Sequence, residues 1–220
     1  AVALGPGVTA SGAALLGRAS HVLDGGAADL VVVVAADGDG EALYLLDGPV
    51  NSASAVPFDQ TRPQATLIFE GSAAHRIADE AAVARARDIY RVAIAMESVG
   101  AARRCLDLTV DYLKTRQQFG RLLGSFQALR HRAADCAVAL EAATATARYA
   151  SWVVDGNPGE LAEIAPLAKA LATQAFRDIA AEMIQLHGGI GFTWEHDTHL
   201  YFKRATANYL LGGTPADERR

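Results

Sequence analysis

Residues Asp79 to Gly120, DEAAVARARDIYRVAIAMESVGAARRCLDLTVDYLKTRQQFG, carry the clearest structural signal in the sequence. Alanine, leucine and arginine dominate it, proline is absent, and glycine is almost absent until the stretch ends. These residues are strong helix formers, so the stretch predicts one long helix that ends near Phe119. The composition changes sharply at the start of this helix, which indicates that a separate kind of structure precedes it.

Three more helices are predicted after the first. We expect them at residues 125–155, 160–187 and, as a shorter helix, about 196–211. The first of these ends at the turn Gly156-Asn157-Pro158-Gly159, and the second ends at Gly188-Gly189. The connections between them are short, and short connections join antiparallel neighbours. Residues 78–220 are therefore expected to form an antiparallel four-helix bundle.

Residues 1–77 carry the pattern of strands and turns. Short apolar or β-branched runs occur at Leu30 to Val34, Leu43 to Leu46 and Ala65 to Phe69. Segments rich in Gly, Asp, Asn and Pro separate these runs. Asp37-Gly38-Asp39-Gly40, between the first two runs, is typical of a hairpin turn. The expected fold class is α+β, with a small β-barrel-like or sheet domain followed by the helical bundle.

The composition and charge of the sequence exclude several classes of function. A net charge of −5 with scattered lysine and arginine gives no basic face for nucleic acid. The longest apolar run, Leu30 to Ala36, is too short to cross a membrane, so a cytoplasmic location is expected. Cys105 and Cys136 lack CxxC spacing and are expected to be buried free thiols rather than metal ligands. The chain starts at Ala1 within a Gly- and Ala-rich stretch, so preceding residues are expected.

The first stretch with chemical potential is Thr115 to Arg121, at the end of the first long helix. A planar guanidinium, that of Arg116, next to the aromatic Phe119 suits a diphosphate and a flat ring system. The alternative is a helix end, with Gly120 as the stop and Arg116 on the last carbonyls. Both interpretations remain open from the residues alone.

The second stretch is Gln185 to Phe192, which follows a helix with three glycines in four residues. Such a turn can bring backbone amides close to a ligand. It can equally be a tight connection in which His187 satisfies a carbonyl. No strand precedes it, so it is not a Rossmann fingerprint.

The third stretch lies inside the first long helix. Asp88 and Arg91 are three residues apart and can pair on one face. Glu97 lies in a largely apolar neighbourhood, where a carboxylate needs a partner or a purpose. An ordinary ion pair and a surface glutamate explain these residues as well as a site does.

Two of these regions together resemble the acyl-CoA dehydrogenase family. YLKTRQQFGRLLGSFQALRHRAAD (Tyr112 to Asp135) is similar to the family's flavin signature, and MIQLHGGIGFTWEHDTHLYFKRA (Met183 to Ala205) to its second signature. The first domain resembles the middle β domain, with His21 to Val34 as the strand pair that covers the flavin. The ending LLGGTPADERR is similar to the actinobacterial hetero-oligomeric branch. The family's N-terminal helical domain is expected before residue 1.

The resemblance implies FAD bound across a subunit boundary. The implied cofactor-binding residues are Arg116, Gln118, Phe119, Gln127, Gln185, Gly188, Gly189 and Thr214. The resemblance implies that Asp88 and Arg91 face the acyl-CoA substrate. The implied reaction is α,β-dehydrogenation of an acyl thioester, with electrons passed to an electron-transfer flavoprotein and a homologous subunit completing a dimer or tetramer.

The sequence departs from the family at the catalytic base. Members carry a carboxylate either just before the Gly-Thr after the last helix or directly before the arginine of the first long helix. This chain has Gly212 in the first place and Tyr90 in the second. Three explanations follow: a non-catalytic partner in a hetero-oligomer, an active enzyme with Glu97 as a relocated base, or a flavin-binding or structural subunit without turnover.

Overall fold

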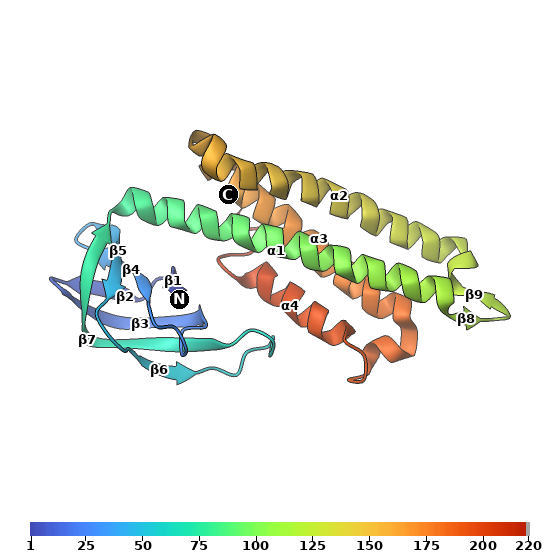
Figure 1. Ribbon diagram of the computed structural model, residues 1–220, viewed down its shortest axis with the longest axis horizontal. Helices are drawn as coiled ribbons and strands as arrows, with labels where there is room; N and C mark the ends of the chain where they lie inside the picture. The colour runs from blue at the N-terminus through green and yellow to red at the C-terminus, as the bar shows by residue number, and fades with distance from the viewer. Residues whose placement is uncertain (219–220) are drawn as a thin grey trace. The chain divides into compact units, whose positions relative to one another are not determined.

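The computed structural model describes residues 1–218 and divides the chain into two compact units, which meet in sequence between Arg87 and Asp88 (Figure 1). Helix α1 (Glu80–Thr115) contributes its first two turns to the first unit and the rest to the second. Each unit has its own hydrophobic core. The expected α+β fold class is confirmed, with strands before helices.

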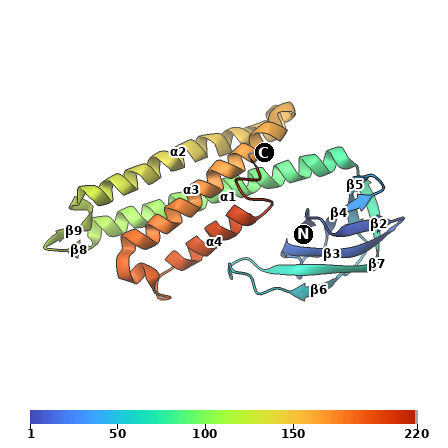
Figure 2. The same ribbon diagram turned by 180° about the vertical axis from the view of Figure 1, so that it is seen from behind.

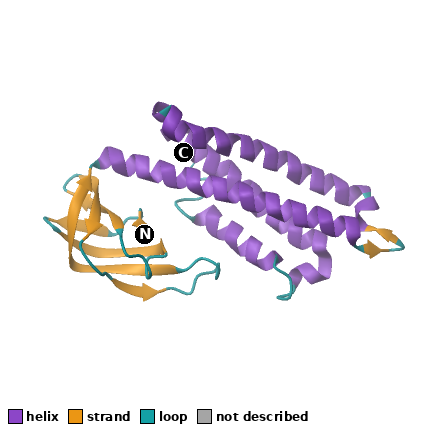
Figure 3. Ribbon diagram, in the orientation of Figure 1, coloured by secondary structure: helices purple, strands orange, loops and turns teal. Residues whose placement is uncertain are grey.

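Within residues 1–87 the strands form one sheet (Figure 3). They are β1 (Val2–Ala3), β2 (Val8–Ser11), β3 (Ala14–Leu23), β4 (Val32–Asp37), β5 (Gly40–Leu46), β6 (Asn51–Ser54) and β7 (Gln64–Ala78). Pairing runs from β4 through β2, β3 and β7 to β5, and β5 pairs again with β4. The sheet therefore closes on itself, which removes most of its free edges and makes it barrel-like.

Alternating burial builds the core of this sheet. Ala65, Leu67 and Phe69 of β7 are each at most 2% exposed, while the residues between them are half-buried. This is the period of two that a strand with one buried face requires. Asp37 pairs with Gly40 across the β4–β5 turn, and Gly38 has a φ of 64°. The predicted hairpin is thus confirmed.

The apolar pattern did not reveal β1, β2, β6 or most of β3, because alanine, glycine and serine interrupt it. The strand pair expected at His21 to Val34 corresponds to the end of β3 and the start of β4, but β3 pairs with β2 and β7, and β4 with β1, β2 and β5. Gly17 in β3 shows why a glycine stands in a strand here. An added Cβ would lie 2.1 Å from the carbonyl oxygen of Gly7, so the two backbones approach too closely for any side chain.

The first turns of α1 pack against the sheet. Val83 is buried beside Val34 and Leu43. Arg87 holds Glu41 with two hydrogen bonds, at 2.6 and 2.9 Å, and this bonding lowers the pKa of the Glu41 carboxyl. These contacts explain why the helix start belongs to the first unit.

The second unit is a bundle of four helices, seen from opposite sides in Figures 1 and 2. Besides α1 it contains α2 (Gln127–Gly156), α3 (Leu161–His187) and α4 (Thr198–Leu210). These bounds lie within two residues of the predicted ones. Short 3-10 turns connect them at Leu123–Ser125, Pro158–Glu160 and Gly188–Phe192. Within residues 1–218, no helix is long and apolar enough to cross a membrane.

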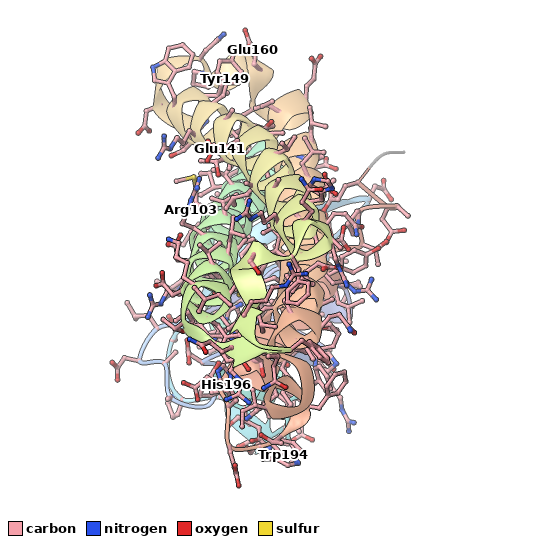
Figure 4. All side chains as sticks on the ribbon, turned by 90° about the vertical axis from the view of Figure 1, so that its right-hand side faces the viewer. Arg103, Glu141, Tyr149, Glu160, Trp194 and His196 are labelled. Carbon is pink, nitrogen blue, oxygen red and sulfur yellow. The ribbon has the colours of Figure 1, made fainter. Side chains whose placement is uncertain are left out.

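Small side chains line the contact between α2 and α3, which run side by side in both views. The alanines concerned are each at most 2% exposed: Ala143, Ala147 and Ala150 from α2, and Ala165, Ala168 and Ala172 from α3. Small residues let two helices approach closely. An ion pair between Arg103 and Glu141 links α1 to α2 on the outer surface of the bundle (Figure 4).

The prediction that α1 runs to Phe119 was wrong. The helix ends at Thr115, and a small hairpin follows, with β8 (Gln117–Gln118) paired to β9 (Arg121–Leu122). Phe119 and Gly120 form its turn, with φ values of 55° and 75°. Two successive left-handed residues favour a hairpin turn over a helix, so Gly120 is a turn residue and not the helix stop.

Both cysteines are free and buried, as predicted, and this makes stability depend on pH. Burial raises the thiol pKa from 9.0 to about 12 for Cys105 and to about 11 for Cys136. Above pH 9 the unfolded chain releases these protons while the folded chain keeps them. The unfolding free energy should therefore fall by about 1.4 kcal/mol per pH unit per thiol.

The measurement compares the wild type with Cys105→Ala/Cys136→Ala by urea unfolding at pH 8 and pH 10. The wild type should lose about 2 to 3 kcal/mol more than the variant over this interval. The comparison cancels the titration of lysines and tyrosines, which both proteins share. Equal losses would show that the thiols ionise in the folded chain.

Candidate functional site

Two of the three stretches singled out from the sequence border one cavity of about 620 Å³ inside the second unit. The structure thus joins the end of α1 to the end of α3, segments about 70 residues apart. Its lining residues are Tyr112, Arg116, Gln118, Phe119, Leu123, Leu129, Arg132, Gln185, Leu186, His187, Gly188, Gly189 and Ile190. The volume lies within the range of about 300–1,000 Å³ that small-molecule and cofactor sites occupy.

The hairpin after α1 presents Phe119 at one wall of the cavity. Its side chain is 90% exposed, and its ring meets the ring of Phe126 edge-on with centroids 6.3 Å apart. The guanidinium of Arg121 lies over the other ring, 3.8 Å from the centroid of Phe126. An aromatic residue held at a turn with most of its surface uncovered can stack on a flat ligand.

Arg116 differs from its neighbouring arginines in lacking a partner. Arg132 binds both carboxylate oxygens of Glu182, at 2.7 and 2.8 Å, and Arg130 donates to the carbonyl of Gly124 at 2.6 Å. Among residues 1–218, no side-chain hydrogen bond or ion pair engages the guanidinium of Arg116, which is exposed and lines the cavity. A free planar guanidinium is suited to bind phosphate oxygens.

The first two glycines after α3 also line the cavity. A Cβ added to Gly188 or Gly189 would meet no atom within 4 Å, so both positions face open space. Gly191 differs, because its added Cβ would lie 2.5 Å from the carbonyl oxygen of Ile184. Gly191 is therefore required for packing, whereas the first two glycines leave room that a ligand can fill.

His187 closes the inner end of the cavity and is 4% exposed. Its Nδ1 lies 2.7 Å from the carbonyl oxygen of Met183, and its ring stacks on Tyr112 with centroids 4.4 Å apart. Burial lowers the pKa of the imidazole, and the nearby His196 adds to this effect. His187 therefore satisfies a carbonyl, as one interpretation expected, and also lines the cavity as a neutral ring. Figure 4 shows His196 and Trp194 at this end of the bundle.

The residues fit the diphosphate and ring system that the motifs imply. The cavity offers a free guanidinium, side-chain amides from Gln118 and Gln185, an exposed aromatic ring and two glycines with open space above them. The guanidinium and the amides can donate hydrogen bonds to the oxygens of a diphosphate, and the exposed aromatic ring can stack on a flat ring system. Two of the implied cofactor-binding residues are not among those that line this cavity: Gln127, which is exposed at the start of α2, and Thr214, which lies in a turn with Asp217.

The two expected base positions lie next to each other. A Cβ added to Gly212, whose φ is 69°, would lie 3.4 Å from the ring of Tyr90 and 4.0 Å from Cε of Lys169. Two places distant in sequence thus converge at one place in the fold. Neither residue carries a carboxylate there.

The acidic residues near these positions already have cationic partners. Asp88 pairs with Arg91 at 2.9 Å, as the spacing predicted, and burial raises the pKa of the Asp88 carboxyl. Glu97 accepts a hydrogen bond from Arg204 at 2.6 Å and is half-buried. The Glu97 oxygen engaged by Arg204 is less available to take a proton from a substrate.

Sequence reasoning missed four residues of this region. Tyr112 and Arg132 line the cavity, and Lys169 and Glu218 form buried charges behind Gly213. A signal existed for Lys169, the only charged residue between Glu163 and Arg177 on α3. A lone lysine in an alanine-rich helical segment indicates a charge that is either exposed or specifically paired.

The wall formed by Gly189 leads to a prediction. Gly189→Val should leave the unfolding midpoint within about 1 °C but weaken at least tenfold the binding of the flavin dinucleotide that the motifs imply, because the new side chain occupies the cavity. The matched change, Gly191→Ala, should instead lower the unfolding midpoint, because its Cβ meets backbone. Thermal unfolding and the flavin absorbance of both variants test this. Unchanged flavin in Gly189→Val would place the ligand elsewhere.

Comparison with known proteins gives consistent matches. Residues 70–219 match the family described as "Acyl-CoA dehydrogenase, C-terminal domain". The chain is 40% identical over 200 residues to acyl-CoA dehydrogenase IpdE2 of Mycolicibacterium smegmatis, which covers 90% of this chain and 59% of that protein. The chain thus spans about three fifths of this relative's length.

Two solved structures are similar over nearly the whole chain. The Tcur3481-Tcur3483 steroid ACAD matches with a TM-score of 0.91 and 28% identity, covering 99% of this chain and 64% of that one. The ChsE4-ChsE5 complex from Mycobacterium tuberculosis matches with a TM-score of 0.91 and 26% identity, covering 100% and 64%. These matches confirm the resemblance drawn from the two motifs.

Proposed function

Because the chain belongs to the acyl-CoA dehydrogenase family, we propose that it is an FAD-binding subunit for α,β-dehydrogenation of acyl-CoA thioesters and the non-catalytic partner in a hetero-oligomer. One observation carries this proposal. The cavity keeps the groups that a flavin dinucleotide needs, whereas the converging base positions hold Tyr90 and Gly212.

Different residues around the cavity bind different parts of the dinucleotide. Arg116 donates to the diphosphate, Phe119 stacks on a ring, and the amides near Gly188 and Gly189 approach the ligand without intervening side chains. FAD when bound supplies the hydride acceptor for the reaction. The site lies at an end of the bundle, and its Arg116 and Phe119 are exposed, which suits a cofactor shared with a neighbouring subunit.

The absence of a base assigns the proton step to another chain. A base must reach the α-hydrogen directly or through one water. Tyr90 and Gly212 offer no carboxylate, and Glu97 is engaged by Arg204. A homologous subunit therefore contributes the carboxylate that removes the α-proton, and an electron-transfer flavoprotein takes the electrons.

The names of the structural relatives support a two-component assembly. One relative is named as a complex of ChsE4 with ChsE5, and the other joins Tcur3481 with Tcur3483 as a steroid ACAD. By analogy, the partner of this chain is a second acyl-CoA dehydrogenase subunit, in a dimer or a tetramer. The substrate is a bulky CoA thioester of the steroid or fatty acyl class.

The test compares the chain alone with the chain co-expressed with its homologous partner. The complex should carry flavin that bleaches on addition of an acyl-CoA, and the chain alone should show no turnover. Full turnover by the chain alone would contradict the proposal. In that case, loss of turnover in Glu97→Gln would identify Glu97 as the base. Absence of flavin in both preparations would leave a structural subunit.

A further inference from the structure

A fully buried lysine lies outside the cavity and has no role in the proposed flavin site. The side chain of Lys169, on α3, is 0% exposed. Lysine is almost never fully buried unless its charge is paired, because moving an ammonium out of water is costly. Burial also lowers the pKa of this lysine. Its partners therefore need an explanation.

The partners of Lys169 come from the segment after α4. Its Nζ pairs with Glu218 at 3.2 Å and donates to the carbonyl oxygen of Gly213. The second carboxylate oxygen of Glu218, a side chain only 3% exposed, accepts from Nε of Arg91 at 2.9 Å. Arg91 also binds Asp88. Two cations and two anions from α1, α3 and this segment thus form a charge-balanced network, in which Lys169 and Glu218 are buried and Arg91 is partly exposed.

This network lies directly behind the position where relatives carry a base. The glycines of the segment, Gly212 and Gly213, have φ values of 69° and 109°. Glycine adopts such positive φ values without steric cost, and because it has no side chain it also leaves the backbone of this segment conformationally free. An added Cβ at Gly212 would lie 4.0 Å from Cε of Lys169 and 3.4 Å from the ring of Tyr90.

We propose that Lys169 and Glu218 are positioning residues that fasten residues 211–218 to the bundle and thereby hold Gly212 against Tyr90. The two glycines make this segment flexible. The contacts of Lys169 with Gly213 and of Lys169 and Arg91 with Glu218 restrict its motion by binding it to α3 and α1. Glu218 is the carboxylate nearest in sequence to Gly212 apart from Asp217, but two cations hold it in the interior, so it serves as an anchor and not as a base. That Gly212 borders an acyl site rests on the proposed function, whereas the fastening does not.

Hydrogen–deuterium exchange on the full chain in its complex tests the fastening. Lys169→Met keeps the length of the side chain and removes its charge. Amides of residues 211–217 should exchange at least tenfold faster in this variant. Amides of residues 116–123 and 186–192, which border the cavity, should exchange as in the wild type. Unchanged exchange in residues 211–217 would overturn the proposal.

A second variant keeps the test informative if Lys169→Met fails to fold. Glu218→Gln preserves the size of the side chain, so a residue that only fills space would tolerate it without a change in exchange. The proposal predicts faster exchange of residues 211–217 here as well, and exchange at the wild-type rate would contradict it. Neither Lys169 nor Glu218 lines the cavity, so a failure of the proposed function appears separately, as absent flavin while both variants still accelerate the exchange of residues 211–217.

Discussion

Replacing Arg116 with alanine is expected to lower flavin affinity by about 10- to 100-fold without unfolding the chain. The reason is that its guanidinium has no partner among residues 1–218 and lines the cavity between Phe119 and the glycines. Hydrogen bonds to a charged group contribute about 1.5–3 kcal/mol, which corresponds to this range. Flavin fluorescence on titration of the apo complex measures the affinity, and far-UV circular dichroism checks the fold.

A matched control separates the loss of a ligand contact from the loss of any surface charge. Arg148 on α2 is also exposed, has no side-chain hydrogen bond or ion pair among residues 1–218, and does not line the cavity. Arg148→Ala should leave flavin affinity within twofold of the wild type. Equal flavin affinity in the Arg116 and Arg148 variants would show that Arg116 does not bind the flavin and is an ordinary residue at the end of a helix.

Replacing Lys169 with methionine should give the largest loss of stability among these variants. Breaking a buried ion pair from one side costs about 3–5 kcal/mol, because the remaining charge stays buried. Glu218 keeps Arg91 as a partner in this variant, so we expect the lower end of that range. Urea unfolding followed by the helical circular dichroism signal measures the change.

Two further variants show whether the loss comes from the orphaned carboxylate. Lys114→Met removes an exposed lysine near the end of α1 and should change the unfolding free energy by less than about 0.5 kcal/mol. Lys169→Met/Glu218→Gln removes both charges and should recover part of the stability lost in Lys169→Met. A double variant that is less stable than the sum of the two single changes would contradict a direct pairing of these residues.

The helical half of the fold could be predicted from the sequence because its signals are local. Gly156 to Gly159 and Gly188-Gly189 punctuate long alanine-rich segments, and α2, α3 and α4 begin and end within two residues of these expectations. The end of α1 could not be predicted in this way. Phe119 adopts a left-handed conformation that its side chain does not signal, and the hairpin turn replaces the last helical turn.

The strands were harder to predict because much of their pattern depends on distant partners. β3 contains Gly17 because the backbone at Gly7 approaches it, and nothing in the local sequence shows that approach. The site followed the same division. The motifs containing Arg116 and Gly188 were visible as chemistry, but only the fold shows that they share a cavity. Likewise, the lone Lys169 on α3 stands out in the sequence, but nothing in the sequence shows that its partner is Glu218, 49 positions away.

The decisive measurement is a structure of the chain in complex with its homologous partner and FAD. We expect the diphosphate of the dinucleotide to lie within hydrogen-bonding distance of Arg116, with a ring of the cofactor against Phe119 and no side chain between the ligand and Gly189. We also expect Tyr90 to remain beside Gly212. Flavin bound elsewhere in the complex, with this cavity filled only by solvent, would show that the cavity is not the flavin site.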